Sequence, residues 1–235
     1  MMSTASIDRH FAAIDCDGEL LRFAGGNETD VYLSDDRRLV VKIKTGAPAD
    51  RTAALADAGR SRCAAERFAA CVGARHAIPS AYLIVGDAHG RPHVLAVQPF
   101  LAGARALAAV DLAGLSRVQR RAIGLQLLAI IGRSARHYLT HGEMPDLYGQ
   151  RSADQGERAA RRGLAALPAR CWSFLVERSL LRSHNLVVTD EREPRLVLVD
   201  YDTVQRGALY RAVYFTARIA LFGRDLPLIL WILAR

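Results

Sequence analysis

The chain has 235 residues and a mass of 25.7 kDa, which suits one large domain or two small lobes. Hydrophobic residues make up 51% of it and charged residues 24%, a balance that excludes a disordered chain. The formal net charge of +8 favours anionic partners such as nucleotides or an acidic membrane surface. Because the basic residues are scattered rather than clustered, the sequence disfavours nucleic acid as a partner.

Lys42 and Lys44 are the only lysines among the 32 basic residues. Lysine is a compact point charge and arginine a wide planar fork, so the two lysines mark positions where arginine would not serve. Coding bias together with chance is the alternative explanation.

The cysteines and the N-terminus indicate a reducing compartment. Cys16, Cys63, Cys71 and Cys171 show no metal-ligand spacing, which is typical of reduced, buried thiols. Met1 to Ala13 contains charged residues and no apolar signal-peptide core. We therefore expect a cytoplasmic protein.

The first hundred residues predict five strands and one helix. Short β-branched or alternating runs bounded by turn residues predict the strands, and an Ala-rich segment with helical spacing predicts the helix from Pro48 to Gly73 after the third strand. The expected strands are Glu19 to Phe23, Asp30 to Ser34, Arg38 to Lys44, Tyr82 to Val85 and His93 to Val97.

Beyond Pro99 the pattern becomes mainly helical, so we place a boundary between a lobe of residues 1–100 and one of residues 101–235. We expect helices over Ala104 to Leu139, with a break near Asp111, and from Leu209 onward. Pro145 to Gly149 is expected as a loop. Further helical stretches are expected at Ala153 to Ala166 and Trp172 to Leu181, and a hairpin with strands Leu186 to Val188 and Leu196 to Val199.

The C-terminus is strongly apolar. Arg224 and Asp225 divide it into two pieces, and neither reaches the ~20 residues that a membrane-spanning helix needs. A final core helix and an interfacial helix that contacts a membrane both fit this pattern.

Several residues of the first lobe have the chemistry of a nucleotide site. Gly25 and Gly26 lie between two strands, where backbone amides can approach a phosphate, although such a pair also makes an ordinary hairpin turn. Lys42 follows an apolar run and is favoured over Lys44 as a phosphate-binding amine. Glu66 on the following helix is the candidate carboxylate for that lysine, or else a solvated surface residue. Gln98 directly follows the fifth strand and is the remaining nucleotide-binding candidate.

Asn185 and Asp200 are the strongest signal. Asn185 precedes one strand of the predicted hairpin and Asp200 follows the other, so both lie at its open end. An amide oxygen and a carboxylate can share Mg²⁺ together with phosphate oxygens. Either residue alone is also a common turn former.

In this order, these residues resemble the motifs of the protein-kinase-like superfamily, which includes the aminoglycoside-phosphotransferase type. The short length and the loop that ends in Asn185-Leu186 look most like the YrbL-type (PhoP regulatory network) proteins. The resemblance implies an α+β, bilobal protein-kinase-like fold. Its N-lobe has a five-stranded antiparallel sheet and one helix, and its C-lobe is mainly helical with a metal-site hairpin over residues 185–202. It also implies ATP and Mg²⁺ as cofactors, phosphoryl transfer, and convergence of Lys42, Asn185 and Asp200 on one polyphosphate.

The sequence departs from this family at the catalytic loop. The position of the catalytic aspartate, five residues before the metal-binding asparagine, is occupied by Leu180. Asp146 and Asp202 are the candidate catalytic residues beside Asp200, and His184 is a further candidate proton acceptor. A structural role is the alternative for each of the three. The family's Asp-Phe-Gly triplet reads Asp200-Tyr201-Asp202 here, without its glycine.

Three functions remain open from the sequence. The first is an atypical phosphotransferase with an unknown acceptor, and the second is a pseudokinase that serves as a nucleotide-responsive or scaffolding module. The third is a basic membrane-peripheral protein that contacts the bilayer through its C-terminal helix.

Overall fold

The computed structural model describes residues 21–25, 29–44, 46–87, 89–149, 178–201, 203–204 and 207–234. Contacts divide the chain into two compact units. The first comprises the described residues of Met1–Cys63 together with Pro79–Leu101, and the second comprises Ala64–Ile78 and the described residues of Ala102–Arg235. The second half of the long helix α2 (Arg51–Val72) therefore belongs to the second unit, whereas the sequence places the whole helix in the first lobe.

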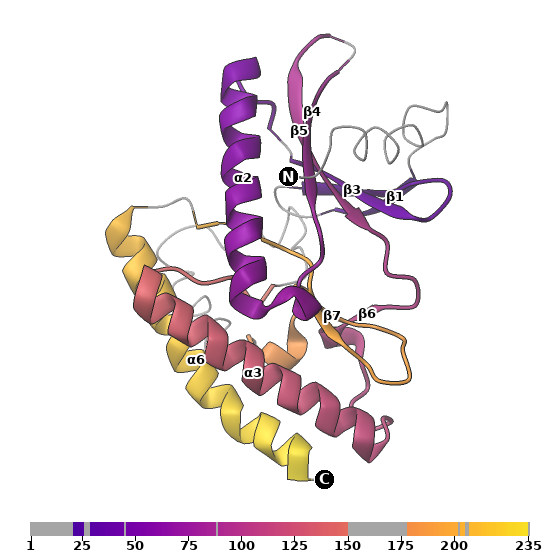
Figure 1. The fold of residues 1–235 in the computed structure, drawn as a ribbon, viewed down its shortest axis with the longest axis vertical. Coiled ribbons are helices and arrows are strands. Elements are labelled where there is room, and N and C mark those ends of the chain that lie inside the picture. Colours follow the sequence, from indigo (N-terminus) through magenta and orange to yellow (C-terminus); the bar gives the residue numbers. More distant parts are fainter. Residues whose placement is uncertain are drawn as a thin grey trace, which may run out of the picture. The chain divides into compact units, whose positions relative to one another are not determined.

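The first unit is built on an antiparallel sheet in the order β1-β2-β3-β5-β4 (Figure 1). All five predicted strands are present, within about three residues of their expected ends. Their bounds are Leu21–Gly25 (β1), Thr29–Leu33 (β2), Leu39–Lys44 (β3), Ala81–Gly86 (β4) and Pro92–Pro99 (β5).

The alternation of side chains along β3 explains how the two faces of the sheet are covered. Val41 packs with Leu95 and Val97 on one face. On the opposite face, Val94 packs against Ala54 and Ala58 of α2, and their small side chains let the helix lie close to the sheet. The predicted helix is present and begins at Arg51.

The second unit combines a small sheet with two long helices. β6 (Arg105–Ala106), β7 (Leu186–Val188) and β8 (Leu196–Leu198) form an antiparallel sheet in that order. The long helices are α3 (Arg117–His141) and α6 (Ala208–Ala234). The α+β class, the five-stranded antiparallel sheet with its helix, and the mainly helical second part with its short hairpin are thus confirmed.

Local sequence signals set the two ends of α3. The Ser116 side chain accepts a hydrogen bond from the Gln119 backbone, and the Gln119 side chain accepts one from the Ser116 backbone, which makes a capping box. Gly142 ends the helix in the left-handed region at φ 69° and donates its N–H to the Tyr138 carbonyl.

Two helical predictions were partly wrong. Ala104 to Leu139 was expected to be helical on both sides of a break near Asp111. Instead, β6 and a 3₁₀ turn at Leu107–Ala109 precede α3, because Arg105 and Ala106 pair with β7. The hydrogen bonds to β7 outweigh the intrinsic preference of this Ala-rich stretch for helix. Only a 3₁₀ turn at Leu180–Arg182 is described near the end of Trp172–Leu181, and Ala153–Ala166 lies outside the described residues.

The helix predicted from Leu209 onward is confirmed as one continuous helix, α6. α6 runs through Arg224, Asp225 and Pro227, and it buries Phe215, Leu221, Phe222, Ile229 and Ile232. Within the residues that the structure describes, no helix combines the length and the apolarity needed to cross a bilayer.

Cys63 and Cys71 are both free thiols on α2. The prediction of burial was wrong for Cys63, which is exposed because its position on the helix faces solvent. Cys71 is half-buried, and burial raises its pKa.

Candidate functional site: the mouth of the β7–β8 hairpin

The structure brings Asn185 and Asp200 to the same end of the hairpin. The backbone N–H of Val199 donates to the carbonyl of Asn185 at 2.9 Å, directly beyond the paired residues Leu186 and Leu198. Asp200 is the next residue after Val199 in the chain. Asn185 therefore forms the last hydrogen-bonded pair of the hairpin with Val199, and Asp200 directly follows that pair.

The Asn185 side chain is held in one orientation. Its Nδ2 donates to the backbone carbonyl of Asp146 at 2.8 Å, which leaves Oδ1 as the acceptor atom of the amide. A hydrogen bond from His184 N to Gly149 O at 2.9 Å keeps the same loop in place. A Cβ at Gly149 would overlap the Asn185 amide, so any other residue here would displace that side chain.

Ser183 shapes the entry into β7. Its buried hydroxyl oxygen accepts hydrogen bonds from the backbone N–H groups of Asn185 and Leu186, both at 3.1 Å. The local turn thus satisfies two donors that would otherwise lack partners at the start of a short strand.

Tyr201 anchors the residue next to Asp200. Its ring is buried and its hydroxyl donates to the Ile78 carbonyl at 2.8 Å. The middle position of the Asp-Tyr-Asp triplet therefore binds the segment that follows α2, while Asp202 lies outside the described residues.

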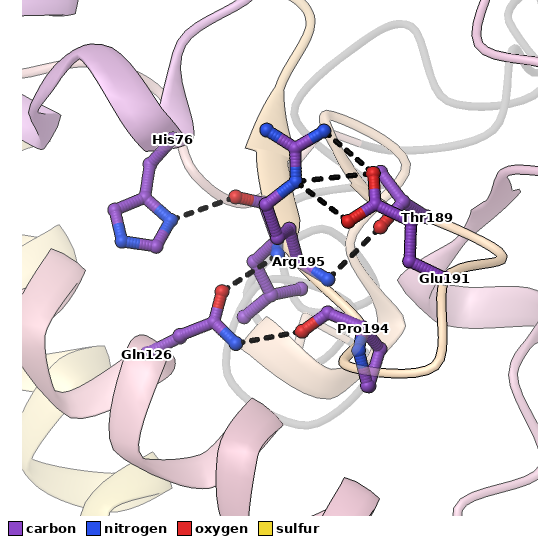
Figure 2. Close-up of polar contacts among 7 residues, drawn as sticks. His76, Gln126, Thr189, Glu191, Pro194 and Arg195 are labelled. Atoms are coloured by element: carbon purple, nitrogen blue, oxygen red, sulfur yellow. Dashed lines mark hydrogen bonds and ion pairs between the residues drawn. The ribbon is translucent and has the colours of Figure 1, made fainter.

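The outer edge of β8 is covered by side chains from two other elements (Figure 2). Gln126 of α3 accepts from Leu196 N at 2.9 Å and donates to Pro194 O at 2.8 Å, so its amide takes the place of a neighbouring strand. His76 Nδ1 lies 2.8 Å from Leu196 O, and Ile78 N donates to Leu198 O at 3.2 Å. An edge strand of three residues gains a fixed position in this way.

The tip of the hairpin is closed by its own side chains. Arg195 N donates to Thr189 Oγ1 at 3.0 Å, and the Arg195 guanidinium binds the Glu191 carboxylate at 2.7 Å (Figure 2). The hydrogen bond from Arg195 lowers the pKa of Glu191. Both ends of the hairpin are thus held independently.

The carboxylate of Asp146 binds α6. Its Oδ2 accepts from Tyr214 OH at 2.9 Å and from Arg218 Nη2 at 3.0 Å, and its Oδ1 accepts from Tyr148 N at 2.9 Å. Burial, and then the charge of Asp146, raise the pKa of Tyr214 to about 12, so the phenol stays a donor. Proton transfer by Asp146 would require it to exchange these partners for a substrate hydroxyl, and its catalytic role stays a prediction.

Leu180, which the sequence resemblance predicts to stand where the catalytic aspartate would be, is a core residue. Its side chain is fully buried, and its backbone N–H donates to Oδ2 of the buried Asp225 at 2.7 Å. Arg224 binds the other oxygen of Asp225 at 2.7 Å and also donates to the Arg178 carbonyl. The loop that would carry a base is therefore fixed by a buried carboxylate on α6.

In the first unit, Lys42 lies in the middle of the central strand β3. It is half-buried and is paired in register with Val31 of β2 and Ala96 of β5. By the two-residue period of a strand it shares the face of Lys44, which forms an ion pair with Asp57 of α2 at 3.9 Å. The lysines thus lie on the side of the sheet that α2 covers.

The other nucleotide-binding candidates are only partly described. Gly25 ends β1, while Gly26 lies outside the described residues. Gln98 is buried on β5, and its Nε2 donates to Ser80 Oγ at 2.9 Å. Glu66 is exposed on the second half of α2. Their roles in binding stay predictions.

The donor set suits a metal that needs few protein ligands. Among the residues that the structure describes, no three His, Cys, Asp or Glu side chains cluster to hold a metal ion. Magnesium bound with a nucleotide uses one or two protein oxygens and takes the rest from phosphate and water. Asn185 Oδ1 and the Asp200 carboxylate, at one hairpin mouth, fit that requirement.

Several supporting residues escaped sequence reasoning. Gly149 resembled an ordinary turn glycine, and Asp225 resembled a break between two apolar segments. Gln126 carried no motif at all. Only for Asp225 was there a usable signal, because a single carboxylate in a long apolar helix predicts a buried partner.

Comparisons with known proteins add little. No protein-family model matches the sequence, and no curated protein matches it. Solved structures that resemble the chain include an aminoglycoside phosphotransferase with GDP and kanamycin (12% identity, 99% of this chain and 84% of that one, TM-score 0.43). Another is a spectinomycin phosphotransferase with ADP and spectinomycin (12% identity, 86% of this chain and 69% of that one, TM-score 0.40). A third is the choline kinase LicA from Streptococcus pneumoniae (10% identity, 97% of this chain and 79% of that one, TM-score 0.38). With TM-scores below 0.5, these likenesses support no inference, so the proposals below rest on this chain's residues.

Proposed function

We propose that this protein is a small, atypical kinase-like phosphotransferase that binds Mg-ATP. The observation that carries the proposal is the hairpin mouth, where Asn185, with its oriented amide, forms the last hydrogen-bonded pair and Asp200 directly follows that pair. Asn185 Oδ1 and the Asp200 carboxylate would hold Mg²⁺, and Lys42 would bind phosphate. When bound, the metal would neutralise charge on the phosphate oxygens. Within the superfamily, the loop resembles that of YrbL-type proteins most.

The residues around the hairpin would preorganise this site. Gly149 and Ser183 hold Asn185, and Tyr201 anchors the chain directly after Asp200, so little backbone ordering would accompany binding. Phosphoryl transfer depends mainly on positioning and electrostatics, and a general base adds a further ~10²–10⁴-fold. A slow enzyme is therefore compatible with Leu180.

The pseudokinase is the second candidate, and a specific observation favours it. Leu180 is a core residue whose backbone is tied to Asp225, so this position supplies packing rather than a proton acceptor. Under this alternative the chain binds Mg-nucleotide without turnover and responds to it as a regulatory or scaffolding module.

Thermal unfolding with ATP, in the presence and absence of Mg²⁺, tests the nucleotide site. Binding to the native state raises its stability, by about 2.7 kcal/mol at a ligand concentration 100 times Kd. We expect a magnesium-dependent rise in Tm that Asp200→Ala removes and the exposed control Asp35→Ala retains. Absence of any shift in the wild type would exclude both candidates.

ATP turnover then separates the two candidates. The phosphotransferase hydrolyses or transfers the γ-phosphoryl group, and Asp200→Ala abolishes this activity while Asp35→Ala retains it. Binding without turnover identifies the pseudokinase. Turnover that survives Asp200→Ala would show that the metal assignment is wrong.

A further inference from the structure

α3 and α6 form an antiparallel pair along one side of the second unit (Figure 1). Near one end, the Tyr138 hydroxyl lies 3.4 Å from Thr216 Oγ1 and its ring stacks at a tilt on Phe215. Near the other end, Leu233 packs so closely on Gly124 that a Cβ there would lie 2.7 Å from its Cδ2. The pairing therefore extends over most of both helices.

Outside this contact, α6 exposes an apolar face. Its core-facing residues recur with helical spacing, and the positions opposite them include Val213, Pro227, Leu230 and Trp231. Leu230 and Trp231 are 55% and 54% exposed. On this part of the helix the core contact is made by Ile229 and Ile232, which are 0% and 4% exposed. Packing in the core therefore does not explain why Leu230 and Trp231 are apolar.

The exposed face of α3 alternates apolar and cationic residues. Val118, Leu125 and Leu139 are exposed, and Arg121 and Arg136 lie on the same side of the helix by its period. α3 contains no acidic residue, and the single acid of α6, Asp225, is fully buried. Neither helix thus exposes a negative charge.

We propose that these apolar and arginine-bearing exposed sides of α3 and α6 bind the surface of an anionic lipid bilayer. Leucine and tryptophan side chains would enter the boundary between headgroups and acyl chains, and the arginines would bind lipid phosphates. Tryptophan favours this interfacial depth because its ring is large and amphipathic. The net charge of +8 adds long-range attraction to the same partner.

Charge decides against the other occupants. Two copies of the face brought together would place arginines against arginines without any acid to pair with them. A nucleic acid would pair with the arginines but offers no apolar layer for the exposed leucines. An anionic bilayer supplies both the negative charge and the apolar layer.

Co-sedimentation of the full-length protein with vesicles tests the proposal. We expect binding to vesicles of equal parts phosphatidylcholine and phosphatidylglycerol, weak or no binding to phosphatidylcholine alone, and a decrease with salt. The double variant Leu230→Gln, Trp231→Gln should weaken binding by about tenfold or more. The pair Arg121→Gln, Arg136→Gln should weaken it by about fivefold per arginine.

Matched controls separate this face from a general surface effect. Leu55→Gln and Arg51→Gln replace an exposed leucine and an exposed arginine on α2, and they should leave vesicle binding unchanged. All the replaced side chains are exposed, so the Tm of each variant should stay near that of the wild type.

Two outcomes would overturn the proposal. One is that the wild type does not bind anionic vesicles, or that the α2 control variants lose binding as much as the α3 and α6 variants do. The other is a dimer in sedimentation velocity that Leu230→Gln, Trp231→Gln dissociates without any vesicle binding, which would assign the face to a second copy. The Mg-ATP shift is measured separately, so failure here leaves the nucleotide site unaffected.

Discussion

At the scale of single residues, the candidate metal site depends on side chains that bind no ligand themselves. Gly149 leaves room for the Asn185 amide, and Asp225 accepts a hydrogen bond from the backbone of Leu180. Both are far along the chain from the residue that they position. Their substitution should therefore affect the site without removing a metal ligand.

Gly149→Ala should displace the Asn185 amide, since the new Cβ would overlap it. We expect the free energy of unfolding to fall by about 1–3 kcal/mol from overpacking and the Mg-ATP shift in Tm to be lost. Thermal unfolding with and without ligand measures both. Gly132→Ala is the control, because a Cβ there meets nothing within 4 Å, and it should retain the full ligand shift. An undiminished shift in Gly149→Ala would contradict the role given to Asn185.

Asp225→Ala should be destabilising. The variant leaves Arg224 without its carboxylate and the buried Leu180 N–H without an acceptor. The Arg224 side chain is 34% exposed and can be solvated, so the main loss is the unsatisfied Leu180 N–H. Such a loss costs about 1–3 kcal/mol, and urea unfolding would show a corresponding decrease. Asp35→Ala replaces an exposed carboxylate and should change stability by no more than about 0.5 kcal/mol. Equal effects of the two substitutions would show that Asp225 has no structural role.

At the scale of elements, β8 shows how a short strand becomes rigid. Its backbone is bonded on one side to β7 and on the other to Gln126, His76 and Ile78. The strand that leads to Asp200 is therefore held by side chains from α3 and by the segment after α2. Among these contacts, the one made by His76 can depend on pH, because histidine changes its charge in the physiological range.

Protonation of His76 should weaken this edge. Burial lowers its pKa most, while the hydrogen bond to Leu196 opposes the shift and the charges of Arg133, Arg75 and Arg195 add to it. Because the folded state resists the proton that the unfolded state accepts, the stability from neutral His76 is complete above the unfolded pKa of about 6.5. It declines as the pH falls from there toward the folded pKa.

We therefore expect the free energy of unfolding to decrease as the pH falls from about 7.5 to about 5.5, with a smaller decrease in His76→Gln. Urea unfolding across this range measures the difference. Hydrogen exchange at the Leu196 amide would report on the same edge locally. Identical pH dependence in both proteins would show that His76 does not couple to folding.

At the scale of the whole molecule, the sequence predicted the order of elements well. The five strands of the first unit were readable because each is an apolar or β-branched run bounded by turn residues. β6 was missed because Arg105 and Ala106 have no strand propensity, and their conformation comes from pairing with Val187 and Val188. Asn185 and Asp200 could be placed together from the sequence because both lie directly beside predicted strands; their role as metal ligands stays a prediction.

The supporting contacts of the site could not be predicted in the same way. Asn185 donates to Asp146 O and packs against Gly149 only because the loop that contains these two residues lies beside it. That placement is a property of the folded chain. The same holds for the partners of Asp146, since Tyr214 and Arg218 lie on a helix far along the chain. Local patterns carry no information about such pairings.

Truncation before Leu226 should compromise the second unit as a whole. It removes Ile229 and Ile232 from the core and Leu233 from its contact with Gly124. Loss of two buried isoleucines costs about 3–6 kcal/mol, so we expect aggregation or a much lower midpoint in urea. The full-length double variant Leu230→Gln, Trp231→Gln is the control and should remain soluble and stable. A well-folded truncated protein would show that this part of α6 is not a core helix.

The placement of both lysines on β3 makes the chain suited to chemical footprinting. A reagent that acylates ε-amines can modify only this one strand, and Lys44 is already engaged by Asp57. Mass spectrometry of the two adducts would therefore compare the accessibility of Lys42 with that of Lys44. If Lys42 binds phosphate, occupancy by nucleotide should slow its acylation while that of Lys44 changes little.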